Sequence, residues 1–249
     1  MTNDQKKIGE MNNPVCFGAG VNSTALVILL VQRGWRGPIL FADTGAEQDE
    51  TYSFLRVFDR WLEGYGLSIT HIGADYRSNR YKPNLINAIE TYCQIPLMRA
   101  RWCTAEYKIE PIKRWCNQNG YDFNQCFVGI AYDEAHRQPE KIRPLVDWKV
   151  TRSDCARIIQ DAGLPVPPKS GCWCCPFQSK SQWRHLWETQ RGRYFYLAWV
   201  EQRASFAAGR RVTFDPDGLS LFSLALQFRN GQPTLFDISE FYMPCLCRT

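Results

Sequence analysis

The stretch at residues 14–24, "PVCFGAGVNST", indicates the fold, because a short apolar run ends there in a glycine-rich turn. A long apolar stretch, "ALVILLVQRGW" (25–35), follows at once. A buried strand, a tight turn and a helix are the elements that fit this order. Such a turn places free backbone N–H groups at a helix N-terminus, which is an anion site, and phosphate is the usual anion.

The residues of this turn leave two interpretations open. Gly18 and Gly20 allow a ligand to approach the backbone closely. Three side chains can cap the helix and donate to phosphate oxygens: Asn22, Ser23 and Thr24. The stretch is neither a P-loop, since the lysine is missing, nor a G-x-G-x-x-G fingerprint. The alternative to a phosphate site is a tight turn followed by an ordinary helix cap.

Strand and helix signals alternate from this turn onward. Apolar runs predict buried strands at 14–17, 38–43, 67–73 and 125–131. Runs with helical spacing predict helices at 22–33, 49–66, 104–120 and 151–163. This alternation indicates an α/β fold with a doubly wound parallel sheet.

The composition changes near residue 165. The segment "LPVPPKSGCWCCPF" (164–177) is rich in Pro, Gly and Cys, and a long helical stretch is expected to follow over about 179–207. No clear period follows in 210–249. The expected domains are an N-terminal tail, a nucleotide-binding domain and a Cys-rich, helical C-terminal extension, at 1–13, 14–165 and 166–249.

Overall composition limits the partners and the compartment. The 249 residues are 45% apolar and 22% charged, as in an ordinary globular protein, and the net charge of +5 permits a nucleotide or nucleic-acid partner without requiring one. The longest apolar run, Ala25–Val31, is too short to span a bilayer, so no membrane partner is expected. The N-terminus lacks the apolar core of a signal peptide, which predicts a cytoplasmic protein. The 11 cysteines are then not a disulfide framework, and their grouping suggests a metal site.

The second expected strand ends in "FADTGAEQDE" (41–50). Ligands of doubly wound sheets bind at the carboxyl ends of the strands, and this end lies beside the first loop. Asp43 is therefore placed to contact an adenosine or a metal ion. Asp49 and Glu50 suit the first turn of a helix, where acidic residues are favoured.

Six motifs in order resemble the phosphoadenosine phosphosulfate reductase family, within the adenine-nucleotide α-hydrolase (PP-loop) superfamily. They lie between residues 14 and 178: "FGAGVNS" as the PP-loop, "DTGAEQDETYSF", "RWCTAEYKIEP", "GIAYDEAHR", "PLVDW" and "SGCWCCP". The resemblance implies that nucleotide is bound by Phe17, Gly18, Ala19, Gly20, Asn22, Ser23, Thr24, Asp43, Thr44, Gly45, Arg101, Gly129 and Glu134. It implies catalytic roles for Asp43, Lys108 and Arg137.

The same resemblance implies an ATP pyrophosphatase that uses Mg²⁺ and releases AMP and pyrophosphate. Relatives of this kind activate a substrate so that sulfur can enter it. The expected substrate is a nucleic acid, with DNA phosphorothioation ahead of tRNA thiolation, and a cysteine desulfurase is a possible sulfur donor.

The sequence departs from the family pattern in three places. Ala19 replaces a loop glycine, and Asn22 stands where many PP-loop enzymes have Asp. The Glu-Cys-Gly-Leu-His segment of sulfonucleotide reductases is missing, and the chain ends in "PCLCRT" (244–249). Two alternatives follow: a sulfonucleotide reductase that releases sulfite, and a nucleotide- or nucleic-acid-binding module without turnover.

The cysteines carry the metal hypothesis. Cys172 and Cys175 form a C-x-x-C pair, and the resemblance adds Cys103 as the third ligand. The candidates for a fourth ligand are Cys174, Cys93 and Cys116. A three-cysteine 4Fe–4S cluster would leave one iron open for a sulfide. The alternatives are a zinc site and packed thiols without metal.

The stretch "QWRHLWETQRGRYFYLAW" (182–199) mixes arginines with aromatic residues. Such a mixture can bind nucleic acid through phosphate contacts and base stacking. Aromatic residues at helical spacing more often belong to a core, and the core interpretation is the one we favour here.

Overall fold

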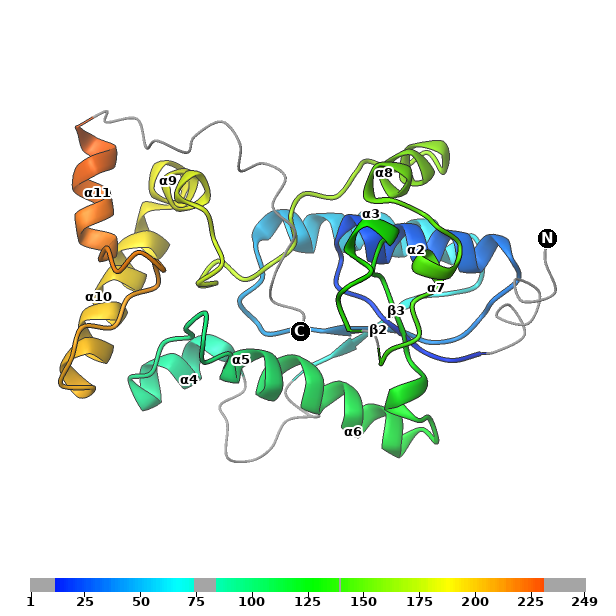
Figure 1. Ribbon diagram of the computed structural model, residues 1–249, viewed down its shortest axis with the longest axis horizontal. Helices are drawn as coiled ribbons and strands as arrows, with labels where there is room; N and C mark the ends of the chain where they lie inside the picture. Colours follow the sequence, from blue (N-terminus) through cyan, green and yellow to red (C-terminus); the bar gives the residue numbers. More distant parts are fainter. Residues whose placement is uncertain (1–11, 74–83, 139, 231–249) are drawn as a thin grey trace.

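The computed structural model describes residues 12–73, 84–138 and 140–230, so most of the expected N-terminal tail and the C-terminal "PCLCRT" lie outside the described residues. Its centre is a parallel sheet of four strands in the order β3-β2-β1-β4 (Figure 1). The strands are β1 (Val15–Cys16), β2 (Ile39–Ala42), β3 (Ile69–Ile72) and β4 (Phe127–Val128). The expected α/β fold with a parallel sheet is confirmed.

The strand order creates a crevice beside β1. Val15 pairs with Ile39 of β2 on one side and with Phe127 of β4 on the other. The chain therefore winds outward from β1 to β3 and then crosses to the opposite side for β4. The carboxyl edge between β1 and β4 is the switch point where ligands bind in such sheets.

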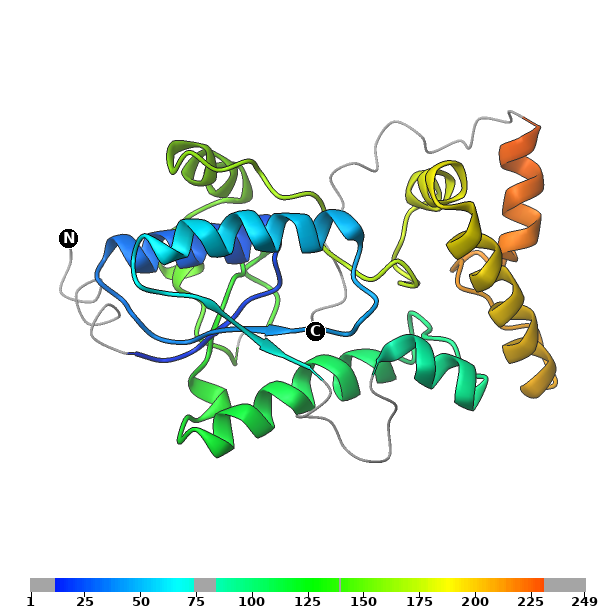
Figure 2. The same ribbon diagram turned by 180° about the vertical axis from the view of Figure 1, so that it is seen from behind.

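Helices cover both faces of the sheet (Figures 1 and 2). One face carries α2 (Val21–Gln32), α3 (Asp49–Glu63) and α8 (Arg152–Asp161). Helix α2 is buried along nearly its whole length, because it packs against both the strands and α8. The other face carries α6 (Glu110–Gln118), whose apolar side meets β2 and β3.

Short helical segments complete this part of the chain. They are α5 (Trp102–Thr104), the π-helical η2 (Ala105–Ile109), the 3₁₀ segments η3 (Phe123–Gln125) and η4 (Tyr132–Glu134), and α7 (Pro144–Asp147). α5, η2 and α6 follow one another without a break. They form one helical stretch that runs from α4, beside the C-terminal helices, to the sheet (Figure 1).

The helical C-terminal region contains α9 (Lys180–Thr189), α10 (Arg191–Ala207) and α11 (Leu221–Arg229). With α4 (Leu85–Tyr92) these helices enclose a second core, around Trp183, Tyr194 and Phe214. Trp183 and Tyr194 of the 182–199 stretch are buried in this core, and Trp187 and Tyr196 pack against it, in agreement with the core interpretation for these residues. In the part of the chain that the structure describes, no helix is long and apolar enough to cross a membrane.

The helices differ from the sequence-based expectations in three details. The long helical stretch expected over about 179–207 is present as two helices, α9 and α10, which are separated at Gln190, whose backbone (φ −136°, ψ 56°) is not helical. Helix α11 lies in the segment where no period was visible, and α4 was not predicted at all.

Hydrogen bonds join the loop that follows β2 to the segment that precedes the C-terminal helices. The backbone N–H of Gln48 donates to the carbonyl of Gly171 at 2.9 Å, and that of Trp173 donates to the carbonyl of Ala46 at 2.9 Å. Glu47 and Cys172 consequently pair as a short antiparallel bridge. This bridge holds the cysteine loop, residues 171–177, against the loop that follows β2.

Candidate functional site

The PP-loop closes on the hydroxyl of Ser23. Helix α2 begins at Val21 with Gly20 as its N-cap, so Asn22 is not the cap expected from the sequence. The backbone N–H groups of Gly18 and Gly20 point at Ser23 Oγ, at 3.4 and 3.2 Å. Ala19 has a φ of 52°, in the left-handed region that glycine favours. The loop thus keeps a glycine-like shape although alanine replaces glycine.

A pocket opens over the N-terminus of α2. Its lining consists of Gly20, Val21, Asn22, Ser23, Gly129, Ile130, Glu134, Arg137, Arg152, Pro168, Lys169 and Ser170. Three of these residues are cationic, and they come from three different segments of the chain. Together with the helix N-terminus they form a site suited to several negative charges. We call it the phosphate pocket.

A buried polar network shapes one wall of the phosphate pocket. Asn22 Nδ2 donates to Glu134 Oε2 at 3.1 Å, and Arg137 forms an ion pair with the same oxygen at 3.1 Å. Arg152 donates from Nη1 to Asn22 Oδ1 at 3.4 Å. Glu134 therefore positions both Asn22 and Arg137.

A larger cavity of about 370 Å³ lies at the switch point between β1 and β4. Its apolar walls include Phe17, Phe41, Ile112, Phe123 and Val128. The polar residues that line it include three lysines, Lys108, Lys113 and Lys141. Its size and apolar walls suit a nucleoside, and it meets the phosphate pocket at Ile130. We call it the nucleoside cavity.

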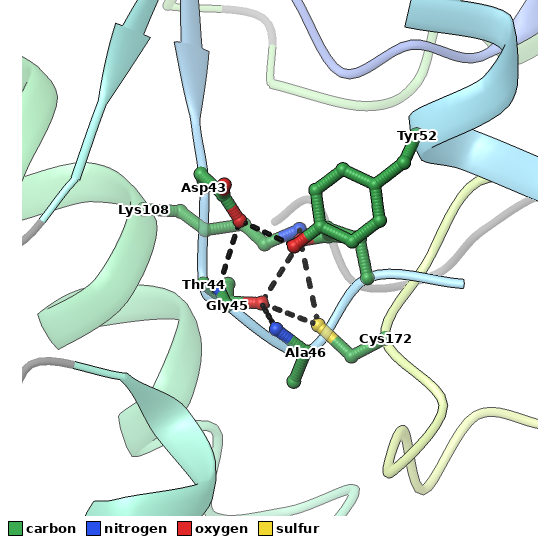
Figure 3. A network of polar contacts seen from close by, with 8 residues as sticks. Asp43, Thr44, Gly45, Ala46, Tyr52, Lys108 and Cys172 are labelled. Carbon is green, nitrogen blue, oxygen red and sulfur yellow. Dashed lines mark hydrogen bonds and ion pairs between the residues drawn. The ribbon is translucent and has the colours of Figure 1, made fainter. Parts of the chain in front are cut away.

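The loop after β2 is held by its own side chains (Figure 3). Asp43 Oδ1 accepts hydrogen bonds from the Gly45 N–H at 2.8 Å and from the Tyr52 hydroxyl at 2.7 Å. Burial, followed by the hydrogen bond to Asp43, raises the pKa of Tyr52 and keeps it a donor. Thr44 Oγ1 lies 3.1 Å from Glu47 Oε1 and 3.2 Å from Cys172 Sγ.

Glu47 is a site residue that the sequence reasoning missed. Its carboxylate is 2% exposed, receives the Thr44 hydroxyl, and forms an ion pair with Lys108 Nζ at 3.2 Å. Lys108, expected to neutralise phosphate charge, thus shares its charge with a buried acid at the edge of the nucleoside cavity. The available signal was the position of Glu47 in the "DTGAEQDE" loop after β2. The prediction for this loop considered only the other acids, Asp43, Asp49 and Glu50.

The cysteine thiols of two segments, Cys103 and the cysteine loop, share one neighbourhood. Burial, followed by the nearby Cys103 and Cys175 thiols, raises the pKa of Cys174 well above its usual value. Burial also raises the pKa of Cys175, to about 11, and that of Cys103, where the charge of Lys108 acts in the opposite direction. In the described residues, no three His, Cys, Asp or Glu side chains are grouped closely enough to hold a single metal ion.

The phosphoadenosine phosphosulfate reductase domain family matches residues 12–168, which is most of the chain. The chain belongs to this family. The matched residues contain the PP-loop, both loops at the switch point, and α8.

Two curated relatives are similar to this family member. An uncharacterised protein of Methanocaldococcus jannaschii is 29% identical over 130 residues, which are 52% of this chain and 25% of that protein. The adenosine 5'-phosphosulfate reductase of Deinococcus radiodurans is 27% identical over 175 residues, which are 62% of each chain. This chain therefore spans a quarter of the first relative's length and under two thirds of the second's.

Within this reductase-family domain, seven of the thirteen expected nucleotide-binding residues line the two cavities: Phe17, Gly18, Gly20, Asn22, Ser23, Gly129 and Glu134. Ala19 lies in the PP-loop beside them, and Asp43, Thr44 and Gly45 lie in the loop after β2. Thr24 is fully buried, and its hydroxyl has no hydrogen-bond partner among the described residues. Arg101 lies over the ring of Phe177 at 5.9 Å, and it lines neither cavity in the described part of the chain.

The candidate fourth cysteine ligands are distributed differently. Cys174 shares the neighbourhood of Cys103 and Cys175. Cys116 is under the opposite face of the sheet, with its Sγ 3.7 Å from that of Cys126. Cys93 ends α4 and accepts a hydrogen bond from Arg203 at 3.3 Å. The pocket cations Arg152 and Lys169 were not predicted from the sequence. Arg152 lies in the stretch 144–168 that resembles the family's Pro-Leu-x-x-Trp element, but it is not one of that element's named positions, and Lys169 follows directly after it.

Proposed function

We propose that this protein binds ATP with Mg²⁺ and cleaves it between the α and β phosphates, in order to activate an oxygen of a nucleic acid for replacement by sulfur. The observation that carries the proposal is the phosphate pocket, where Arg137, Arg152 and Lys169 surround the PP-loop. Cations beside a helix N-terminus suit the negative charges of a triphosphate chain. The adjoining nucleoside cavity provides the space for adenosine.

The two cavities define how ATP would lie. Adenosine would occupy the nucleoside cavity, the α-phosphate would lie over Gly18 and Gly20, and the β and γ phosphates would enter the phosphate pocket. The helix N-terminus and the three cations would stabilise the negative charge that develops on pyrophosphate as it leaves. Asp43, at the adjacent strand end, is the proposed contact for Mg²⁺ or the ribose.

The proposed reaction has two steps. A nucleic-acid oxygen attacks the α-phosphorus, the bond between the α-phosphorus and the bridging oxygen breaks, and pyrophosphate leaves with that electron pair. Hydrosulfide then displaces AMP, so that a bond to sulfur replaces the bond to oxygen. A DNA backbone phosphate is our first choice for the acceptor, a tRNA base is the second, and a cysteine desulfurase is the proposed source of sulfur.

The cysteine loop is the proposed site of a 4Fe–4S cluster. Cys103, Cys172 and Cys175 would hold it, because their thiols share one neighbourhood beside Glu47 and Lys108. A cluster spreads its ligands over several irons, and so it demands less convergence than a single ion does. When bound, it would supply an open iron position able to hold sulfide.

The experiment is product analysis with ATP labelled on the α-phosphate, Mg²⁺ and single-stranded or duplex nucleic acid. The expected products are AMP and pyrophosphate. Formation of ADP and phosphate would contradict the proposal. ATP binding without cleavage under every condition would support the module without turnover.

A sulfonucleotide reductase is the second candidate, because one relative is an adenosine 5'-phosphosulfate reductase and Cys172 and Cys175 lie beside the site. The two candidates separate in one assay. Adenosine 5'-phosphosulfate or its 3'-phosphorylated form is supplied with thioredoxin, and sulfite is measured. Sulfite release without ATP cleavage would replace the first proposal with the second.

A further inference from the structure

One face of α10 carries a row of aromatic and arginine side chains. Arg193, Tyr196, Trp199 and Arg203 recur at intervals of three or four residues, and so they share one face of the helix. We call these four residues the α10 stripe. Tyr196 lies 6.2 Å from Trp199 between ring centroids, and the Arg203 guanidinium lies 4.7 Å from the Trp199 ring.

The α10 stripe begins at the cysteine loop. The Arg193 guanidinium lies 5.4 Å from the ring of Trp173, the residue between Cys172 and Cys174, and the Trp173 ring lies 6.1 Å from that of Tyr196. Arg193 also forms an ion pair with Asp49, in the first turn of α3, at 3.0 Å. The stripe therefore contacts the cysteine loop and the first turn of α3, which follows the loop after β2.

The stripe becomes more exposed with distance from the site. Trp173 is buried, Tyr196 is half-buried, and Trp199 is 46% exposed. Beside the exposed end is a hollow lined by Cys93, Trp199, Gln202, Arg203, Phe206 and Ala207. An indole ring beside a guanidinium and an open hollow offers a flat surface on which a planar group can stack.

The surrounding helices are strongly basic. Residues 180–229 contain eight basic and only four acidic residues. The basic ones are Lys180, Arg184, Arg191, Arg193, Arg203, Arg210, Arg211 and Arg229. Two of the four acids, Glu201 and Asp215, are buried, and so they add little negative charge to the surface.

We propose that the α10 stripe is a stacking platform for the unpaired bases of a single-stranded nucleic acid, which it leads toward the cysteine loop. An aromatic ring flanked by guanidinium groups binds base faces and backbone phosphates together, without selecting a sequence. A duplex hides its base faces, so the exposed indole favours a single strand. The inference describes how the nucleic acid that accepts sulfur would reach the site. It rests on the proposed function only for the statement that the bound strand is that acceptor.

The test measures fluorescence anisotropy of a labelled single strand of about 20 nucleotides, without ATP. Trp199→Ala is expected to weaken binding at least about fivefold. Arg203→Gln is expected to lower the slope of log affinity against log salt by about 0.7. Tyr65→Ala is the matched control, because Tyr65 is another exposed aromatic beside an arginine, Arg36, and it should bind as the unaltered protein does.

Cleavage of ATP by the same preparations separates this inference from the proposed function. Unaltered protein that does not bind the single strand would overturn the platform, as would a Trp199→Ala protein that binds normally. Duplex binding of equal strength and equal sensitivity to these variants would overturn it too. Single-strand binding that depends on Trp199, in a protein that forms no AMP, would support the platform and contradict the proposed function.

Discussion

Arg152 stands at the start of α8, and its guanidinium reaches Asn22 at the wall of the phosphate pocket. It is not one of the named positions of a family motif, yet it lines the pocket proposed for the β and γ phosphates. Charge-assisted hydrogen bonds to phosphate contribute about 1.5–3 kcal/mol each. We therefore expect Arg152→Gln to lower kcat/KM for ATP cleavage by about 10- to 100-fold.

The same helix supplies the control for Arg152. Arg157 also lies on α8, but it is largely exposed and pairs with Asp154. Arg157→Gln should leave ATP kinetics unchanged. Equal kinetics for the Arg152 and Arg157 variants, measured by pyrophosphate release, would remove Arg152 from the site.

Gly129 is required by close packing between the end of β4 and the PP-loop. A Cβ at this position would lie 2.5 Å from the Ser23 Cα and 2.6 Å from the Ser23 backbone nitrogen. Backbone atoms cannot move aside as a flexible side chain can, so Gly129→Ala must displace the start of α2. We expect it to lower the free energy of unfolding by about 1–3 kcal/mol and to weaken ATP binding.

Denaturant unfolding and ATP titration check this expectation for Gly129. Gly192→Ala is the control, because a Cβ there meets nothing within 4 Å, in the first turn of α10. That variant should be at least as stable as the unaltered protein, since alanine favours helix. A Gly129→Ala protein with normal stability and normal ATP affinity would contradict the packing argument.

At the scale of elements, the sequence is informative where one local signal decides the structure. The glycine-rich turn between β1 and α2, and the Asp-Thr-Gly loop after β2, follow from short patterns of residues. Helix α4 escaped prediction because it is short and ends at Cys93 in a left-handed conformation (φ 49°), where glycine is the usual signal. Its remaining signals were the Asn84 cap and three buried apolar residues.

The part of the site that the sequence did not reveal is made by tertiary packing. Lys169 and Ser170 follow α8 in a loop without regular structure, and only the fold returns this loop to the PP-loop. A Cβ on Gly20 would lie 3.0 Å from Ser170 Oγ, which shows how closely the two segments approach. Such a contact leaves no pattern in either segment, and so sequence spacing alone cannot predict it.

The C-terminal helices contain a buried acid that makes their stability depend on pH. Glu201 of α10 accepts the backbone N–H groups of Phe214 at 2.9 Å and Leu221 at 2.8 Å. Burial raises the pKa of Glu201 from 4.5 to about 7. Folding therefore favours the protonated acid, so this stabilisation is complete below pH 4.5 and is lost as the pH rises through 7.

We expect the free energy of unfolding to fall by at most about 3 kcal/mol across this pH range because of Glu201. Glu201→Gln should flatten this part of the stability curve, although losing one N–H acceptor lowers stability at every pH. Urea unfolding at several pH values measures the effect. Glu188→Gln, on the exposed side of α9, should keep the original slope, and a Glu201→Gln protein with that same slope would refute the assignment.

At the scale of the whole molecule, two cores meet at the site. The phosphate pocket lies at the N-terminus of α2, whose apolar residues form one core, and the core around α10 holds the aromatic residues of the C-terminal helices. The short bridge between Glu47 and Cys172 joins the two regions, with Lys108 paired to Glu47 at the same point. On the two proposals above, the cysteine loop would lie between the region that binds ATP and the region that binds the single strand.

Cys103 and the cysteine loop are far apart in the sequence, and they converge because both pack against the core around α10. If the thiols hold the proposed 4Fe–4S cluster, protein purified without oxygen should be brown, and Cys172→Ser or Cys175→Ser should bleach it. Cys155→Ala should keep the colour, since Cys155 is packed in the core under α8. Iron and zinc analysis accompanies the spectra. Colourless anaerobic protein with one zinc per chain would refute the cluster and assign a structural metal to the junction.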